Sequence, residues 1–195
     1  QTCIAAKRFI VEDPVYEPFL EPLAGKVRAL KVGDPLDPST DVGPLARPDL
    51  VEELQAQVDA SLAAGARLVL GGKPLKGPGC FYPPTLLADV TPDMAVFREE
   101  TFGPVAALIR ARDAEHALAL ANDTEFGLGA SIWTRDLARG EALARRMEAG
   151  SVFINGMVKS DPRLPFGGIK ASGYGRELSY FGIRQFVNVK TVWVG

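Results

Sequence analysis

Hydrophobic positions in the first half of the chain follow two different spacings. Residues 8–11 (RFIV) form a short apolar run that an Asp-Pro pair ends, which predicts a buried strand. Apolar residues three or four positions apart predict helices over residues 15–31 and 48–64. Residues 33–49, rich in Pro, Asp and Gly, predict a loop between the helices, and residues 67–72 predict a second strand. The helical stripes consist of Val15, Phe19, Leu23, Val27 and Leu30, then Leu50, Leu54, Val58 and Leu62.

The second half of the chain alternates strands and helices more regularly. Strands are predicted over residues 103–111, 129–134 and 151–155, with helices over residues 113–123 and 136–150 between them. This β-α-β-α-β order is typical of an α/β fold with a mostly parallel sheet and helices on both faces. Because sites in such sheets gather at the carboxyl ends of strands, we expect chemistry in the segment that follows residue 155.

The carboxyl terminus has a pattern of its own. Residues 186–194 (FVNVKTVWV) alternate, with Val187, Val189, Thr191 and Trp193 on one face, which predicts a long strand with no following helix. No earlier strand is an obvious partner, so we expect it to pair with another segment or another subunit. The predicted organisation is therefore a domain over residues 1–182 and a terminal strand over residues 183–195.

Composition and charge narrow the class of protein. The chain has 195 residues, 47% of them hydrophobic and 24% charged, which suits a globular domain with a real core. No apolar run is long enough to span a bilayer, and the first residues lack the features of a signal peptide. A formal net charge of −2 gives no electrostatic reason to expect a nucleic-acid or membrane partner.

The chain has two cysteines, Cys3 and Cys80, which are far apart in sequence. Two cysteines do not make a disulfide framework, and without a CxxC pair a zinc site is unsupported, so no metal is expected. A reducing, cytoplasmic setting with two free thiols fits this pattern best.

Cys3 opens a predicted helical turn (CIAAKR), where backbone N–H groups favour a thiolate. The alternative is that Cys3 is a small buried hydrophobic residue, the commoner state of a free cysteine. A thiol protease would need a partner histidine. The single histidine, His116, falls inside the predicted helix of residues 113–123, which argues against that class.

Two further segments are candidates for chemistry. Residues 99–105 (EETFGPV) place two carboxylates before a predicted strand; they are either solvated charges or acceptors for sugar hydroxyls. Residues 165–177 (PFGGIKASGYGRE) form a glycine-rich segment, which is either a surface turn or a functional loop. Neither contains the GxxxxGK[ST] or GxGxxG spacing of a nucleotide-phosphate loop.

Taken in order, these segments resemble blocks of the aldehyde dehydrogenase superfamily, specifically of its carboxyl-terminal half. The resemblance covers essentially the whole chain and is greatest to bacterial succinate-semialdehyde dehydrogenases. The matching blocks are QTC (1–3), VGDPLDPSTDVGPL (32–45), EETFGPV (99–105), ANDTEFGL (121–128), VFIN (152–155) and PFGGIKASGYGRE (165–177).

The resemblance implies specific roles for the site residues. Cys3 would be the nucleophile that forms a thiohemiacetal and then a thioester with the aldehyde, and its backbone N–H would be half of an oxyanion hole. The implied cofactor is NAD or NADP, with Glu100 on the nicotinamide ribose and Phe102 near the ring. Phe166 would line the aldehyde pocket.

The resemblance also implies parts that lie outside this sequence. The family's general-base glutamate, the asparagine of the oxyanion hole and the cofactor-binding half would precede Cys3. We therefore expect the chain to be the catalytic part of a longer enzyme, to need its own amino-terminal half as a partner, and to be inactive alone.

Succinate semialdehyde is the substrate that the resemblance implies. Ser160 matches the position where that subfamily places a hydroxyl on the substrate carboxylate; Arg163 is a second candidate, or else forms a structural ion pair. A broad-specificity aldehyde dehydrogenase and a non-catalytic relative are the alternatives. The terminal strand would join another subunit in a homodimer or homotetramer, and Cys80 is expected to be structural.

Overall fold

The computed structural model describes all residues, 1–195. The chain divides into two compact units, residues 1–121 (unit 1) and residues 122–195 (unit 2), and each is described by itself.

Unit 1 is built on a four-stranded sheet. Its strands are β1 (Arg8–Glu12), β2 (Arg67–Leu70), β3 (Thr85–Val90) and β4 (Val105–Ala111), arranged in the order β1-β4-β3-β2. β4 runs parallel to both β1 and β3, whereas β2 is an antiparallel edge strand. Strands that are distant in sequence thus become neighbours, and β4 lies inside the sheet.

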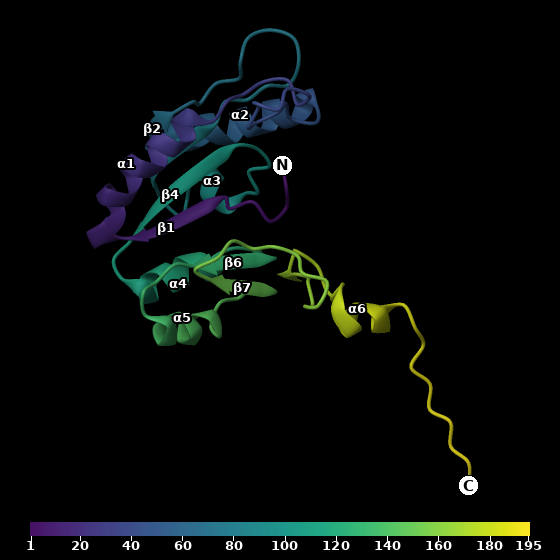
Figure 1. Cartoon of the computed structure of the whole chain (residues 1–195). Helices are drawn as coiled ribbons and strands as arrows, with labels where there is room; N and C mark the ends of the chain where they lie inside the picture. Colours follow the sequence, from purple (N-terminus) through teal and green to yellow (C-terminus); the bar gives the residue numbers. More distant parts are fainter. The chain divides into compact units, whose positions relative to one another are not determined.

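Helices cover both faces of this sheet (Figure 1). The helices of unit 1 are α1 (Asp13–Ala29), α2 (Pro48–Ala63), α3 (Ala95–Arg98) and α4 (Ala114–Asn122), whose last residue falls in unit 2. None of the helices in the chain combines the length and the apolar character that crossing a membrane requires.

Strand side chains alternate between two hydrophobic clusters, as the twofold period of a strand requires. Leu86 and Leu108 pack in the cluster that contains Tyr16 and Leu20 of α1. Their neighbours Leu87 and Ile109 belong to the cluster on the other face, with residues of α2 and α3. Burial on both faces explains why these strands read as nearly continuous apolar runs.

Unit 2 contains short elements. β6 pairs with β7 in parallel, and β5 pairs with β8 in antiparallel orientation. The elements are β5 (Phe126–Gly127), β6 (Gly129–Ile132), α5 (Leu137–Ala144), β7 (Ser151–Ile154), β8 (Ile169–Lys170) and α6 (Ser179–Gln185).

The strands and helices predicted over residues 103–155 occur in the predicted order but do not share one sheet, and β3, which was not predicted, lies between β2 and β4. β4 already has β1 on one edge and β3 on the other, so its backbone hydrogen bonds are taken and β6 cannot join it. The mostly parallel character holds: β1, β3 and β4 are parallel in one sheet, and β6 and β7 in another.

The helix expected over residues 136–150 is shorter than predicted. Asp136 caps its start by accepting a hydrogen bond from the Arg139 N–H, at 3.0 Å. Past Ala144 the backbone bonds shift to tighter turns, and the Glu148 N–H donates to the Asn122 side chain instead, at 2.9 Å. The side chain of Asn122 therefore helps to end the regular helix.

The terminal segment forms no strand within this chain. Residues after Gln185 belong to no helix or strand, and they are exposed. In Figure 1 they run from α6 as an extended yellow segment. A strand needs a hydrogen-bonded neighbour, and no segment of the chain pairs with this one, so its pairing with another subunit stays a prediction.

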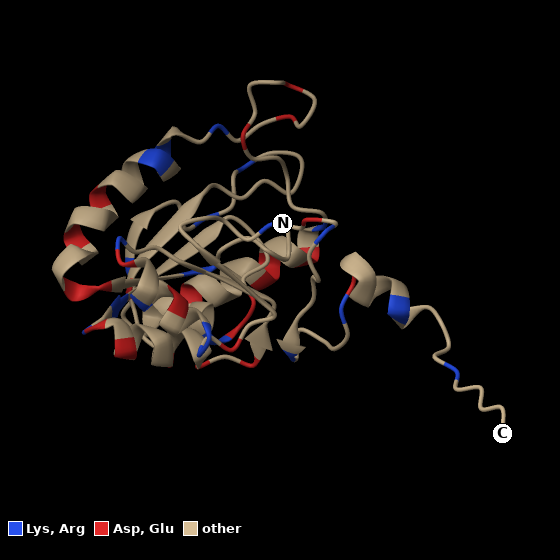
Figure 2. Cartoon of the chain, turned by 60° about the horizontal axis from the view of Figure 1, so that its bottom comes forward, with Lys and Arg blue, Asp and Glu red and all other residues tan.

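Acidic and basic residues are interspersed along the chain (Figure 2). This mixture of signs agrees with the small formal net charge of −2.

Candidate functional site

Cys3 lies in the segment that leads into β1. A turn holds this segment, with the Ala5 N–H donating to the Thr2 carbonyl at 3.0 Å. The turn does not continue into a helix, so the expected helical turn over CIAAKR is a single turn only. Cys3 is a free and exposed thiol, which shows that it is not part of the hydrophobic core.

The segment of residues 99–104 leads into β4 in the same way. β1 and β4 are parallel neighbours, with Arg8 opposite Ala107. The residues that precede the two strands therefore lie at the same end of the sheet, beside the amino ends of both strands. The bond from the Ala107 N–H to the Lys7 carbonyl, at 3.0 Å, ties the segment before β1 to β4. These candidate residues therefore lie at the amino ends of their strands, whereas the general expectation for such sheets is a site at the carboxyl ends.

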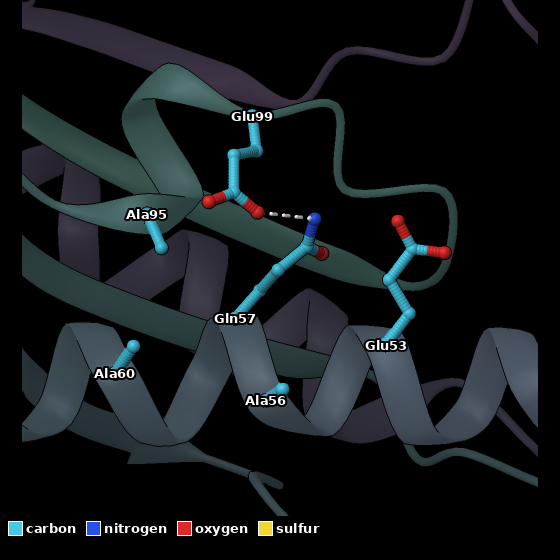
Figure 3. A pocket seen from close by; sticks show the side chains of 6 residues that line it. All are labelled: Glu53, Ala56, Gln57, Ala60, Ala95 and Glu99. Carbon is cyan, nitrogen blue, oxygen red and sulfur yellow. Dashed lines mark hydrogen bonds between the residues drawn. The ribbon is translucent and has the colours of Figure 1, made fainter.

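Gln57 of α2 fixes the turn that carries Glu100. Its Nε2 donates to the Glu99 carboxylate at 3.0 Å and to the Glu100 carbonyl at 3.3 Å. Figure 3 shows the first bond spanning from α2 to Glu99 across a pocket of about 270 Å³. Gly103 completes the turn, because a Cβ there would lie 2.5 Å from the Leu54 side chain.

Lys7 connects the two segments through its side chain. Its ammonium lies 4.0 Å from a Glu100 carboxylate oxygen and 5.4 Å from the centre of the Phe102 ring. Burial lowers the pKa of Lys7, while the charges of Glu100 and Cys3 act in the opposite direction. Glu100 and Phe102 therefore lie beside Lys7, which belongs to the segment that also carries Cys3.

The other three candidates lie in unit 2, after β7. Ser160 and Arg163 are exposed, and Phe166 is half-buried. The Arg163 guanidinium donates to both carboxylate oxygens of Asp161, at 2.9 and 2.6 Å. This pairing lowers the pKa of Asp161, and it matches the alternative in which Arg163 forms a structural ion pair.

The glycine-rich segment is held by backbone contacts. Phe166 and Glu177 form a bridge in which each N–H donates to the other's carbonyl, at 2.9 and 2.8 Å. The Arg176 side chain donates to the Gly168 and Gly175 carbonyls at 2.8 and 2.6 Å. The backbone of Gly150 approaches the Gly167 carbonyl so closely that no side chain fits between them. Phe166 therefore sits on a braced loop.

Sequence reasoning missed Gln57 and gave Lys7 no role. Gln57 is a buried polar residue on the apolar stripe of α2, next to Val58, and a polar residue at such a position is a usable signal. Lys7 gives no comparable signal, because its importance depends on the pairing of β1 with β4.

Two known proteins are similar to the chain over nearly its whole length. The chain is 56% identical over its whole length to a succinate-semialdehyde dehydrogenase [NADP(+)] of Mycobacterium avium, of which it covers 41%. It is 56% identical to succinate semialdehyde dehydrogenase [NAD(P)+] Sad of Escherichia coli, over 99% of this chain and 42% of that protein.

A solved structure is similar throughout the chain. Succinic semialdehyde dehydrogenase from Streptococcus pyogenes, in complex with NADP+, superposes with a TM-score of 0.95 at 41% identity, over 100% of this chain and 43% of that one. The chain thus spans less than half the length of the relatives it matches. Its residues 1–192 match the aldehyde dehydrogenase family, and the chain belongs to that family.

Proposed function

We propose that the chain is the catalytic part of an NAD(P)-dependent aldehyde dehydrogenase that oxidises succinate semialdehyde to succinate. The observation that supports the proposal is that Lys7, four residues after the exposed Cys3 thiol, contacts both Glu100 and Phe102. The names of the relatives from Mycobacterium avium and Escherichia coli support the substrate and the cofactor.

Cys3 is the nucleophile of the proposed reaction. Its sulfur bonds to the aldehyde carbon to give a thiohemiacetal, and the Cys3 backbone N–H stabilises the oxyanion that forms. After oxidation the same sulfur holds a thioester, which water hydrolyses to release the acid and the thiol. The exposed position of Cys3 supports this role, because a carbonyl carbon must reach the sulfur.

Glu100 and Phe102 are suited to hold the cofactor. The Glu100 side chain is 43% exposed and offers a carboxylate to two ribose hydroxyls, while the half-buried Phe102 ring offers a face to a planar group. When bound, the nicotinamide ring supplies the hydride acceptor of the reaction. The residues that would hold the rest of NAD or NADP are proposed to lie before this chain, with the general base and the second oxyanion donor. The chain alone is then inactive.

Ser160 and Phe166 are proposed to select the aldehyde. The exposed Ser160 hydroxyl can donate to the distal carboxylate of succinate semialdehyde, and Phe166 lines the pocket from its braced loop. Arg163 is the secondary candidate for the same carboxylate, because Asp161 already occupies part of its guanidinium. We place the enzyme in the cytoplasm, where a reducing environment keeps Cys3 a free thiol.

The proposal is tested on the intact protein that carries this chain, with NAD and NADP each offered against a panel of aldehydes. We expect reduced cofactor to form fastest with succinate semialdehyde, and Cys3→Ala to lose at least about a thousandfold in kcat. Equal rates with plain aliphatic aldehydes would favour the broad-specificity alternative. No turnover with any aldehyde would favour a non-catalytic relative.

We also propose that residues 183–195 form an arm that pairs with another subunit in a homodimer or homotetramer, outside a catalytic domain of residues 1–182. Exposed apolar side chains support this: Val189 is 84% exposed and Trp193 is 88% exposed. Removing residues 186–195 from the intact protein should reduce the mass measured by light scattering to that of a smaller assembly. An unchanged mass would contradict the arm.

A further inference from the structure

Lys7 is the one cation placed between the nucleophile segment and the turn that carries the proposed cofactor residues. Its backbone is fixed, because its carbonyl accepts the Ala107 N–H of β4 at 3.0 Å. Its side chain is only 19% exposed, whereas a lysine with no partner extends its ammonium into water. The position of the ammonium therefore needs an explanation.

Three groups surround the ammonium. It donates to the Ala5 carbonyl at 3.4 Å, lies 4.0 Å from Glu100 and rests over the Phe102 ring at 5.4 Å. A cation within about 6 Å of an aromatic centroid is attracted to the ring face. The three contacts join the Cys3 segment to both proposed cofactor residues.

Burial of the ammonium has a cost, which is seen in the lowered pKa of Lys7. A packing role alone would be served by an apolar side chain of the same length at no such cost. The negative charge of Glu100 offsets part of the cost, so the Lys7–Glu100 pair is the feature that favours lysine here.

We propose that Lys7 is a positioning residue for the cofactor: its ammonium holds the Glu100 carboxylate in the orientation that receives the ribose hydroxyls. Gln57 anchors the backbone of Glu100, through the bond to its carbonyl, and does not contact its carboxylate. Lys7 supplies the contact at the carboxylate end. The inference rests on the proposed function in one respect, the assignment of Glu100 to the ribose.

The test compares Lys7→Met and Lys7→Arg in the intact protein. Lys7→Met keeps the length and the apolar stem but removes the charge, whereas Lys7→Arg keeps the charge. The dissociation constants of NAD and NADP are measured by calorimetry, and KM for cofactor and for aldehyde by steady-state kinetics. Lys76→Met is the matched control, because it removes the same charge from an exposed loop position.

We expect Lys7→Met to weaken cofactor binding about tenfold, equivalent to about 1.4 kcal/mol, and to leave KM for the aldehyde nearly unchanged. Lys7→Arg should restore binding, and Lys76→Met should leave it unaltered. In a Glu100→Gln background, Lys7→Met should add no further loss, because Lys7 acts through that carboxylate.

Unchanged cofactor affinity in Lys7→Met would overturn the inference, and so would additive losses in the double variant. If Lys7→Met does not fold, Lys7→Gln, which also removes the charge, takes its place in the same comparison, and additive losses of Lys7→Gln and Glu100→Gln in the double variant overturn the inference. Turnover by the unsubstituted protein shows that such a result leaves the proposed function intact. Absence of cofactor binding by the unsubstituted protein would overturn both.

Discussion

The two units of the chain are built in different ways. Both hydrophobic clusters lie within unit 1, where they cover the two faces of its sheet. In unit 2 the buried residues are all glycines, namely Gly127, Gly140, Gly168 and Gly182. Unit 1 is therefore organised around large apolar side chains, whereas unit 2 is organised by close approach of its backbone.

This difference extends to the candidate residues. In unit 1, Glu100 and Phe102 are held by a lysine and by a turn that a buried glutamine fixes. In unit 2, Ser160 is exposed on a loop, and large aromatic side chains such as Trp133 are exposed as well, at 67%. A region without its own apolar core depends on surfaces outside itself for stability.

The largest expected effect is a difference in thermal unfolding between the two units. We expect residues 1–121 produced alone to unfold cooperatively on heating, and residues 122–195 produced alone to show no cooperative transition. Circular dichroism with thermal scans measures both. Cooperative unfolding of the isolated second unit would show that its glycine contacts suffice without an apolar core.

A glycine-to-alanine substitution adds one methyl group, and its effect on the free energy of unfolding should differ between the two kinds of packing. In Gly150→Ala the new Cβ meets the Gly167 carbonyl, a backbone atom that cannot turn aside, so we expect a loss of about 3 kcal/mol or more. Gly25→Ala in α1 is the control, because its Cβ meets nothing, and there we expect a gain of about 0.5–1 kcal/mol. Denaturant unfolding measures both; equal effects would contradict the contrast.

The pH dependence of unfolding at alkaline pH tests the burial of Tyr82 in the core of unit 1. Burial raises the pKa of Tyr82 to about 12, and its hydroxyl donates to the Gln55 side chain at 3.1 Å. The unfolded chain releases this proton near pH 10 and the folded chain near pH 12, so the free energy of unfolding falls as pH rises between them, by up to about 2.7 kcal/mol.

Tyr82→Phe should remove this contribution to the fall in the free energy of unfolding. At neutral pH it should lower the free energy of unfolding by about 1 kcal/mol, because the hydrogen bond is lost. Tyr174→Phe, at a fully exposed ring, should leave the fall in place. Denaturant unfolding at pH 9 and pH 11.5 compares the variants. A fall that persists undiminished in Tyr82→Phe would show that Tyr82 does not cause it.

The smallest effect is expected at the substrate loop of unit 2. Ser160→Ala in the intact protein should raise KM about tenfold for succinate semialdehyde and little for an aliphatic aldehyde, because only the former has a distal carboxylate. Equal changes for both aldehydes would remove Ser160 from substrate recognition.

Sequence reasoning was most successful where the signal is local. The strand at residues 8–11, the helices α1 and α2 and the strands around Leu108 and Val152 appear within a few residues of their predicted bounds. Their periodicity depends only on neighbouring residues. It missed the strand β3, and it extended the helix after Asp136 too far, because Asn122, distant in sequence, takes the Glu148 N–H.

By itself the sequence determined the family, the candidate residues and most of the longer elements, but not β3, because motifs and periodicity are properties of consecutive positions. The tertiary structure alone decided that β1 lies beside β4 and that β4 is an interior strand. Strand order depends on which distant segments bury each other's faces, and no local pattern encodes it. That pairing brings Lys7 to Glu100 and Phe102, and it joins two segments that are distant in the sequence into one site.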